Sequence, residues 1–527
     1  MPDYFGGAGR CPLPLVKLYP MLLSRRRFTT AAIAGLAGSL ASRMRAFPPR
    51  PKLLICLIAE QFRQAYLDRN RAFLVPGGFR RLMEHGAYFP DCRMPASGFT
   101  ASGLATLATG TYPQVHGIVA DRWFDRKSRA PVSAGADMLE AGTLAGELER
   151  AGHCRIYCVG LKEMPTSLLA GNSKALVCWM DSDGRFTTRG NLPEWLAGVN
   201  RLNPADRLHD AKWMAVGAGP DALPLRNLTY DKTKPGEFLT LYQASPFGQE
   251  AQFDLLRQLI VNERLGQQGT SDVVFLALGS MELLGYETGS DSPLMDQMTL
   301  RLDRQIRTLI EMLDKSPWEG NYDLVFAAAH GAPREPDAAR RSTKAIPGRD
   351  LALGIDRALQ DWFDKGTVKN SYVDRYLYPF LYLRPDTLRK QNVAPRAARR
   401  VAGEVALRLP GVAGYFTEDG DCSHSGEWRQ RFANSFHALR SGDVMLSYEP
   451  GDVEDFGAGR GVSYGSLYNY DTHVPLMLYG AQFRPEVFER PVESVDLAPT
   501  LARAAMVSAP SSSTGRVLAE AFAEERR

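Results

Sequence analysis

Three long apolar runs constrain the fold of this chain more than any other feature of its sequence. They cover residues 52–60 (KLLICLIAE), 272–278 (DVVFLAL) and 322–330 (YDLVFAAAH). A continuous apolar run of this length is typical of a strand that is buried on both faces, as in a parallel sheet covered by helices. Amphipathic helical sequence at residues 301–313 lies between the second and third runs. The sequence therefore predicts an α/β fold with a mostly parallel central sheet.

Two of these runs end in a polar side chain. The first run ends at Glu60 and the third at His330. Because the carboxyl ends of the strands in an open α/β sheet border the crevice where ligands bind, we expect Glu60 to face that crevice. For His330 two interpretations remain, a functional imidazole or an ordinary hydrogen-bonded histidine at a strand end.

A short helix is predicted over residues 101–108, where small and apolar residues (ASGLATLA) precede Gly110. Glycine commonly follows the end of a helix, and Thr100, which precedes the run, is the expected N-cap residue. The second interpretation of Thr100 is a nucleophile. A helix N-terminus offers unpaired N–H groups and partial positive charge, which favour an alkoxide and an incoming phosphate.

The residues around this helix resemble a known family. Residues 108–118 read ATGTYPQVHGI, which is similar to the nucleophile segment of the alkaline phosphatase superfamily, in its branch of bacterial threonine-nucleophile phosphatases related to the type I phosphodiesterases and nucleotide pyrophosphatases. The resemblance is colinear from about residue 52 to residue 518 and places Thr100 on the family's nucleophile. It implies a three-layer α/β/α sandwich with an active site at the strand ends, and inserted cap elements at about residues 181–244 and 350–440.

The resemblance also implies two zinc ions that act together on the nucleophile and the phosphate. In the family one ion is bound by Asp, His and His, and the other by two Asp, one His and the nucleophile. The corresponding positions here carry Glu282, Tyr286 and His473 for the first ion, and Glu60, Ala329, His330 and Thr100 for the second. A catalytic zinc ion typically has about three protein ligands. We therefore expect a degraded metal site, in which Glu60, Glu282, His330 and His473 are the candidate ligands.

The positions that hold the phosphate in the family are also changed. Lys162 matches a family lysine that contacts the phosphate, but Met164 replaces the arginine two residues further on. Asp121 replaces an asparagine that contacts the substrate phosphate, and a carboxylate repels that dianion. The segment 463–466 (SYGS) stands where relatives often have Thr-His-Gly-Ser. We expect Lys162 to be catalytic and both Lys162 and Asp121 to face the substrate.

Further ligands from the second predicted insertion remain an alternative. His424 and Asp421 are the possibilities there, although most residues of this kind are polar surface groups.

The first 46 residues differ from the rest of the chain. Residues 24–28 (SRRRF) precede a weakly apolar run at residues 31–40, and small residues follow at 39–41. This pattern resembles a twin-arginine export signal and predicts a periplasmic or extracellular protein. The alternative is a membrane anchor, but the apolar run is too short to span a bilayer. Met21 is an alternative start.

The remaining residues, 47–527, have the composition of a globular domain with a large core. Of the 63 basic and 59 acidic residues, seven and one lie in the first 46 positions, which leaves 56 and 58. This balance indicates no nucleic-acid partner. The six cysteines of this part have no spacing typical of a zinc or redox site, and we expect buried free thiols.

Two functional hypotheses follow. The first is an exported hydrolase of phosphoric esters with a rebuilt metal site and weak or altered activity, acting on a small phosphorylated substrate. The second is a pseudophosphatase that serves as a binding or scaffold protein. A sulfatase-like or phosphonate-type hydrolase is less well supported, because no Cys-Xaa-Pro-Xaa-Arg segment lies near Thr100.

Overall fold

The computed structural model describes residues 50–201, 205–333, 344–455 and 464–523. The predicted export leader, residues 1–46, lies outside these ranges. The central feature of the described part is a ten-stranded sheet with the strand order β19-β2-β18-β11-β1-β10-β5-β6-β7, in which β20 also pairs with β2. Its strands are β1 Leu53–Gln61, β2 Ala87–Arg93, β5 Cys154–Gly160, β6 Leu176–Met180, β7 Phe186–Thr188, β10 Ser271–Leu278, β11 Tyr322–His330, β18 His473–Gly480, β19 Glu486–Val487 and β20 Val492–Glu493.

The middle of this sheet is parallel, as the apolar runs predict. Strand β1 pairs in parallel with β10 on one side and β11 on the other, and β10, β5 and β6 continue the parallel order. Strands β1, β10 and β11 are buried along their whole length. Strand β18 is antiparallel to both of its neighbours, and β7 is antiparallel to β6. The prediction of a mostly parallel α/β sheet is therefore confirmed.

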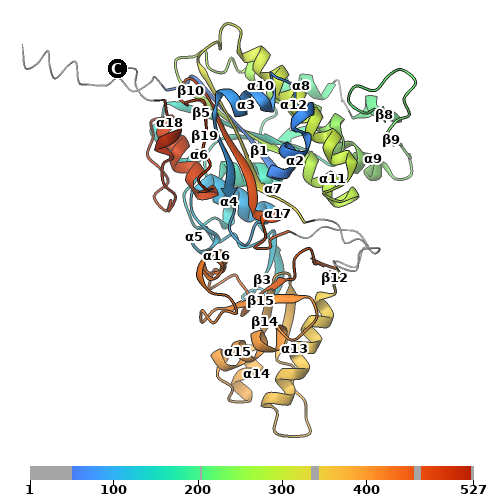
Figure 1. The fold of residues 1–527 in the computed structure, drawn as a ribbon, viewed down its shortest axis with the longest axis vertical. Helices are drawn as coiled ribbons and strands as arrows, with labels where there is room; N and C mark the ends of the chain where they lie inside the picture. The colour runs from blue at the N-terminus through green and yellow to red at the C-terminus, as the bar shows by residue number, and fades with distance from the viewer. Residues whose placement is uncertain (1–49, 202–204, 334–343, 456–463, 524–527) are drawn as a thin grey trace, which may run out of the picture. The chain divides into compact units, whose positions relative to one another are not determined.

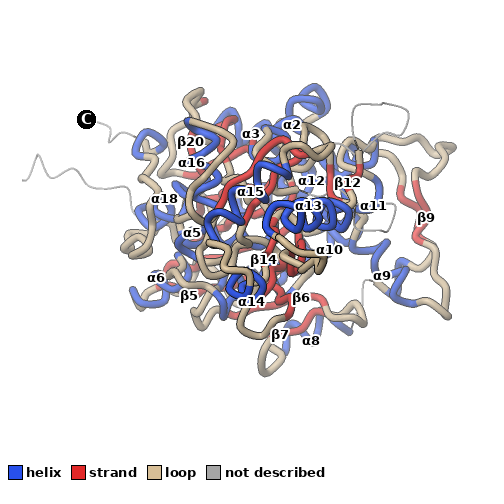
Figure 2. The backbone as a smooth tube through the Cα atoms, turned by 90° about the horizontal axis from the view of Figure 1, so that it is seen from below, coloured by secondary structure: helices blue, strands red, loops and turns tan. Residues whose placement is uncertain are grey.

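Helices cover both faces of the sheet (Figures 1 and 2). Four helices contact one another on one face, and five others pack together on the opposite face. The first set consists of α4 Thr100–Thr109, α6 Leu144–Ala151, α7 Glu163–Ala170 and α18 Leu497–Ala504. The second set consists of α2 Gln64–Asn70, α3 Phe79–His85, α10 Pro246–Asn262, α11 Ser280–Thr288 and α12 Pro293–Leu313. This arrangement is the three-layer α/β/α sandwich that the resemblance implies.

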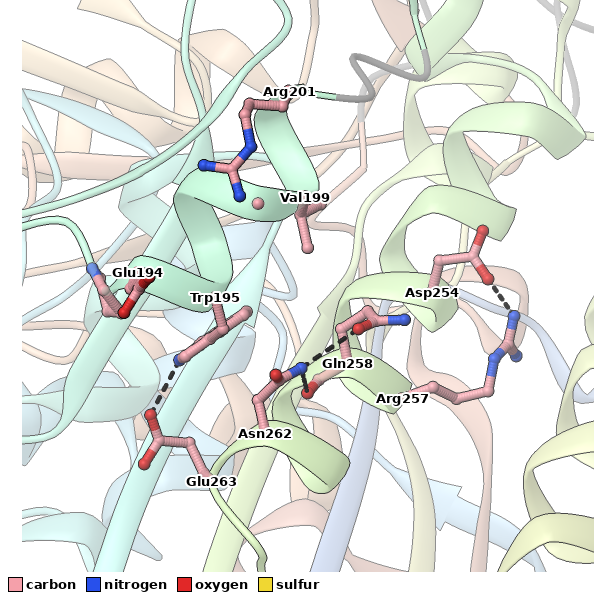
Figure 3. A pocket seen from close by; sticks show the side chains of 11 residues that line it. Glu194, Trp195, Val199, Arg201, Asp254, Arg257, Gln258, Asn262 and Glu263 are labelled. Carbon is pink, nitrogen blue, oxygen red and sulfur yellow. Dashed lines mark hydrogen bonds and ion pairs between the residues drawn. The ribbon is translucent and has the colours of Figure 1, made fainter.

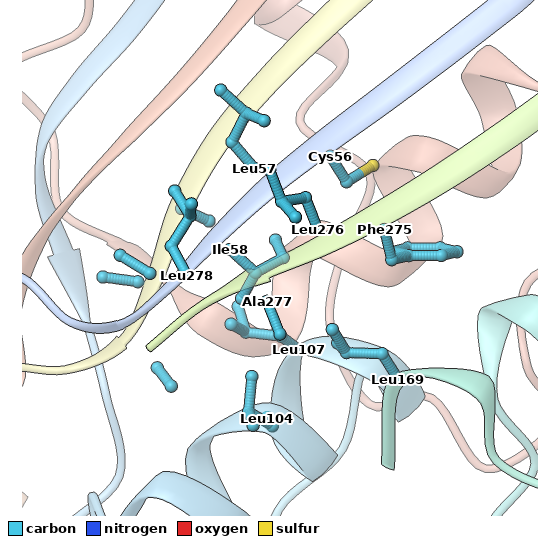
Figure 4. Close-up of a cluster of buried hydrophobic side chains, with 14 of the residues drawn as sticks. Cys56, Leu57, Ile58, Leu104, Leu107, Leu169, Phe275, Leu276, Ala277 and Leu278 are labelled. Atoms are coloured by element: carbon cyan, nitrogen blue, oxygen red, sulfur yellow. The ribbon is translucent and has the colours of Figure 1, made fainter. Parts of the chain in front are cut away.

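Helix α4 packs directly against the central strands of the sheet. Leu104 and Leu107 of α4 join an apolar cluster with Ile58 of β1 and Ala277 of β10 (Figure 4). Such burial is worth roughly 1.5–3 kcal/mol for each fully buried leucine side chain. The packing therefore fixes the position of the helix relative to the ends of the central strands.

Two segments extend the sandwich. Residues 186–243 form short elements, namely β7, α8 Glu194–Arg201, β8 Ala211–Trp213, β9 Arg226–Leu228 and α9 Pro235–Gln243. Residues 348–448 form a small module with its own apolar core, in which the strand order is β13-β14-β16-β15. The module contains α13 Gly348–Phe363, β13 Val373–Leu377, β14 Phe380–Leu383, α14 Pro385–Lys390, α15 Pro395–Ala406, β15 Val412–Thr417, α16 Gly426–Ser435 and β16 Val444–Tyr448. These are the regions where the sequence predicts cap insertions.

Short elements complete the described part of the chain. They are α5 Pro113–His116, β3 Arg122–Asp125, β4 Ala130–Ser133, β12 Ala345–Ile346, β17 Val453–Glu454 and α17 Asn469–Thr472. Within the described ranges, none of the helices combines the length and the apolar character needed to cross a membrane.

Candidate functional site

The carboxyl ends of the central strands bring five predicted residues together. Glu60 lies near the end of β1 and His330 ends β11, while Glu282 lies in the first turn of α11, directly after β10. Lys162 follows β5, and Thr100 is the first residue of α4. Each of these side chains contacts at least one of the others, so they form one cluster, which we call the Thr100 cluster.

Thr100 lies at the centre of this cluster and is only 2% exposed. Its Oγ1 lies 3.0 Å from Nε2 of His330 and 3.2 Å from the hydroxyl of Tyr464, and it donates a hydrogen bond to the carboxylate of Glu282. The expected N-cap role of Thr100 is wrong, because Phe99 is the N-cap residue and the threonine is the first helical residue. Its side chain is therefore free to point away from the helix and into the cluster.

Lys162 joins the two glutamates. Its Nζ donates a hydrogen bond of 3.0 Å to Oε2 of Glu60 and a second, shorter one to Oε2 of Glu282. Both glutamates are almost fully buried, whereas the lysine side chain is 30% exposed. Buried carboxylates are costly unless a charge partner compensates them. The ammonium group supplies that compensation from within the chain.

The electrostatics of the two glutamates differ. Burial raises the pKa of Glu60 to about 8, although the ammonium of Lys162 opposes this rise. Burial also disfavours the charged form of Glu282, but Lys162 and His330 outweigh it and bring the pKa of Glu282 below its usual value. Glu282 is thus the carboxylate that stays ionised.

His330 is held from both sides of its ring. Its Nδ1 lies 2.5 Å from the carbonyl oxygen of Gly331, and its ring stacks on Tyr464 with 3.9 Å between the centroids. A carbonyl oxygen only accepts hydrogen bonds, so Nδ1 carries a proton. In the neutral ring Nε2 then carries no proton, and it lies 3.0 Å from the hydroxyl oxygen of Thr100.

Asp121 lies at the positive end of α4. Its Oδ1 accepts a hydrogen bond of 2.7 Å from the backbone N–H of Ala101, the second residue of that helix. Burial raises the pKa of Asp121 to about 6, and the nearby Glu282 adds to this rise. Met164, which stands where the family has an arginine, packs against the apolar core. The structure therefore places a carboxylate and a thioether where the family has two phosphate-binding side chains.

His473 does not belong to the Thr100 cluster. It is the first residue of β18, and its Nε2 lies 3.5 Å from Oδ1 of Asp91 on the neighbouring strand β2. Tyr464, for which the sequence predicted no role, lies in the cluster instead: its hydroxyl donates a hydrogen bond of 2.7 Å to Glu282 and lies 3.2 Å from Oγ1 of Thr100. The sequence signal for this position was the segment 463–466, since relatives often carry histidine at its second residue.

Asp421 and His424 lie elsewhere as well. Both precede α16, and the ring of His424 lies against Trp428 and Phe432. Asp421 is 3.7 Å from Arg396 in an ion pair. Neither side chain makes a contact with the Thr100 cluster among the interactions of the described residues.

The residues of the cluster do not fit a pair of zinc ions. The side chain of Ala329 has no atom that could bind a metal ion. Tyr286 stands where the family has a histidine, and Tyr464 stands where relatives often have one. The ammonium of Lys162 already binds the two glutamates. Within the described residues, no group of three or more His, Cys, Asp or Glu side chains is arranged to hold a metal ion. A catalytic zinc ion typically has about three such ligands, and the cluster does not supply them for two ions.

A separate surface pocket of about 850 Å³ lies between α8 and α10 (Figure 3). Trp195 forms part of its wall and donates a hydrogen bond of 2.8 Å to Glu263. The charged residues Asp254 and Arg257 on its rim pair with each other. None of the side chains that line this pocket belongs to the Thr100 cluster.

The fold and the threonine at the head of α4 define a hydrolase-type α/β sandwich of the alkaline phosphatase superfamily. Residues 54–453 match the family "Type I phosphodiesterase / nucleotide pyrophosphatase", and the chain belongs to this family. By their names, its members include phosphoric-ester hydrolases.

Individual relatives agree with this assignment. The chain is 24% identical over 518 residues to alkaline phosphatase PhoV of Synechococcus elongatus, covering 89% of this chain and 93% of that protein. It is 23% identical over 535 residues to alkaline phosphatase PafA of Elizabethkingia meningoseptica, covering 92% and 97%. The crystal structure of wild-type PafA matches with a TM-score of 0.80 at 22% identity, over 91% of this chain and all of that chain. At this identity the structural match supports the shared fold alone.

Proposed function

We propose that this chain is an exported, metal-independent member of its family that acts as a binding protein and hydrolyses phosphate esters poorly or not at all. This proposal adopts the pseudophosphatase hypothesis. The observation that carries it is the bridge from Lys162 to Glu60 and Glu282. An internal ammonium group holds the two carboxylates that a metal ion would need.

The burial and hydrogen bonding of Thr100 support the same proposal. A threonine hydroxyl is a weak nucleophile unless a metal ion or an adjacent base activates it. Thr100 is buried and uses its hydroxyl in hydrogen bonds within the cluster. The changes at Met164 and Asp121 also remove donors for the phosphate, so that both activation and binding of a phosphate ester are weakened.

A second candidate function is slow, metal-independent ester hydrolysis. The contacts of Thr100 with His330 and Glu282 favour it, because either group is placed to accept the hydroxyl proton. A general base contributes about 10²- to 10⁴-fold to a rate. Enzymes accelerate reactions by about 10⁶-fold or more, so this contribution alone leaves the activity low.

Export and location belong to the same proposal. The pattern of residues 24–40 supports a twin-arginine type of signal, and the mature protein, residues 47–527, would then work in the periplasm or outside the cell. In the alternative in which the hydrolase is active, Glu60, Glu282 and His330 bind zinc or another metal ion and the substrate is a small phosphorylated molecule.

Elemental analysis and a hydrolysis assay distinguish these alternatives. The mature protein is equilibrated with excess zinc and desalted, and the bound zinc is measured per chain. The same preparation is assayed with 4-nitrophenyl phosphate and bis(4-nitrophenyl) phosphate, with Thr100→Ala as the matched control. We expect well under one zinc ion per chain and equal, very low rates for both proteins. About two zinc ions per chain, together with hydrolysis that Thr100→Ala abolishes, would refute the proposal.

A further inference from the structure

The pocket between α8 and α10 has the size of a small-molecule site. Its volume of about 850 Å³ falls within the range of roughly 300–1,000 Å³ that is typical of ligand pockets. One face of α8 forms one wall, and the C-terminal half of α10 forms the facing wall (Figure 3). Because no side chain is shared with the Thr100 cluster, this pocket can hold a ligand of its own.

The ring of Trp195 gives the pocket a flat apolar wall that is held in place. The ring packs against the main apolar core, and its Nε1 donates a hydrogen bond of 2.8 Å to Oε1 of Glu263. The other oxygen of Glu263 accepts a hydrogen bond of 3.4 Å from the hydroxyl of Tyr157. Val199, one turn further along α8, adds a second apolar side chain to the same wall. A flat ligand can therefore pack on this wall without reordering Trp195.

Gly198 keeps the middle of this wall open. A Cβ atom added there would meet a single atom within 4 Å, Nη2 of Arg201 at 3.4 Å, which is the end of a flexible side chain. The neighbours therefore do not require glycine at this position, although glycine inside a helix is less stable than alanine. The guanidinium group of Arg201 lies over the gap and forms no ion pair with any described residue.

The other charged groups of the lining are either paired or distant from this gap. Asp254 pairs with Arg257, and Glu263 is held by Trp195 and Tyr157. Glu194 is the first residue of α8, about 10 Å along the helix axis from Arg201. Arg201 is thus the charge that is available to a ligand. Because the lining as a whole carries three acids and two arginines, it repels a dianion more strongly than a monoanion.

We propose that the pocket between α8 and α10 binds a small carboxylate with a flat apolar body, whose charged group pairs with Arg201 over Gly198 and whose body packs on Trp195. A carboxylate matches the planar fork of the guanidinium group, which can donate two parallel hydrogen bonds to it. This inference goes beyond the proposed function, because it assigns a ligand to a second site and holds whether or not Thr100 reacts.

Isothermal titration calorimetry with four matched naphthalene probes tests this inference. Naphthoate is the monoanion, naphthamide is its neutral counterpart, naphthylmethylammonium is the cation, and naphthylphosphonate, which cannot be hydrolysed, is the dianion at mildly alkaline pH. We expect naphthoate to bind the mature protein at least about tenfold more tightly than the amide and the cation. The phosphonate should bind more weakly than naphthoate.

Variants of the pocket test the assigned contacts. Arg201→Gln should bring the affinities for naphthoate and naphthamide to within about twofold of each other. Gly198→Leu fills the gap and should abolish binding of both probes, whereas Gly198→Ala should retain it. Arg408→Gln, at an exposed arginine of the module, is the matched control and should keep the preference for naphthoate. Far-ultraviolet circular dichroism and urea unfolding identify the variants that are folded.

Three results would overturn the inference. The first is that naphthoate does not bind, or binds no more tightly than any one of the other three probes. The second is that Arg201→Gln keeps the preference of the unchanged protein. The third is that folded Gly198→Leu binds naphthoate as the unchanged protein does. Zinc content and hydrolysis, measured on the same preparation, decide the proposed function separately, since the pocket contains none of the residues of the Thr100 cluster.

Discussion

The ammonium group of Lys162 donates a 3.0 Å hydrogen bond to the buried carboxylate of Glu60, although 102 residues separate them in the chain. The same group also binds Glu282, so one partly exposed lysine compensates two buried acids. In this arrangement the charge of the two buried carboxylates is compensated by a side chain of the protein itself.

Replacing Lys162 by methionine should therefore destabilise the protein. Methionine keeps an unbranched side chain, one atom shorter than lysine, but leaves Glu60 and Glu282 without their charge partner. Removal of one partner from a buried ion pair costs roughly 3–5 kcal/mol, and since Lys162 is partly exposed we expect the free energy of unfolding to fall by about 2–4 kcal/mol. Urea unfolding followed by circular dichroism measures this change. The exposed Lys174→Met is the control and should change the free energy of unfolding by no more than about 0.5 kcal/mol. Equal free energies of unfolding for the two variants would contradict the proposed contribution of the ion pairs between Lys162 and the two glutamates.

Gly103 lets α4 approach β11 closely. A Cβ atom at this position would lie 2.1 Å from the carbonyl oxygen of Ala329, which is backbone and has little freedom to move. We expect Gly103→Ala to lower the free energy of unfolding by about 1–3 kcal/mol or more, because the helix must shift away from the strand. Thermal unfolding compares it with Gly190→Ala, where a Cβ atom meets nothing within 4 Å. If both variants unfold at the same temperature, Gly103 does not lie as close to the backbone of β11 as described here.

The buried carboxyl group of Asp323 should make the free energy of unfolding depend on pH. Burial raises its pKa from 3.8 to about 7 in the folded protein, and Gln482 donates a hydrogen bond of 2.9 Å to it. Between about pH 4 and pH 7, the folded state therefore keeps a proton on Asp323 that the unfolded state has lost. The stability that this proton contributes is fully present below about pH 4 and is lost as the pH rises through about 7.

The variant Asp323→Asn stays neutral at every pH and keeps an acceptor for Gln482. Its free energy of unfolding should therefore fall less between pH 4 and pH 8 than that of the unchanged protein, by on the order of 1 kcal/mol or more. Urea unfolding at several pH values measures the difference. Asp221→Asn should follow the unchanged protein, and parallel curves for all three proteins would show that Asp323 does not titrate in this range.

Much of the fold could be predicted from the sequence, because the signals for it are local. The three apolar runs became the three central strands, and the acids and imidazole at their ends reached the same crevice. Two expectations failed on local detail: Thr100 begins α4 instead of capping it, and His473 faces Asp91. The side-chain direction of a residue at the start of a helix or strand depends on backbone geometry that composition does not define.

The bridge at Lys162 could not be predicted in the same way. It joins residues from β1, from the start of α7 and from α11, which are adjacent only after the sheet has formed. Glutamate is one methylene longer than the aspartate that the family resemblance implies for Glu60 and Glu282. Sequence comparison records this change as a conservative substitution, whereas in the folded protein the longer side chains meet the lysine.

If side-chain differences alone prevent this chain from binding the two zinc ions of the family, the backbone around Thr100 should still allow both sites to form. We expect a variant with five substitutions to bind about two zinc ions per chain: Glu60→Asp, Glu282→Asp, Tyr286→His, Ala329→Asp and Tyr464→His. Shorter acids withdraw from the ammonium group, and the other changes restore two imidazoles and a carboxylate at positions around the nucleophile, which gives each ion about three protein ligands.

Elemental analysis after desalting measures the zinc, and 4-nitrophenyl phosphate reports whether hydrolysis returns. The same five substitutions combined with Thr100→Ala should bind zinc but remain inactive, because the nucleophile is absent. A folded five-substitution variant without zinc would show that the strand ends themselves have moved. A gain of zinc would instead show that the strand ends still provide the geometry for the ions, and that the side chains which pair with Lys162 and surround Thr100 are what removed them.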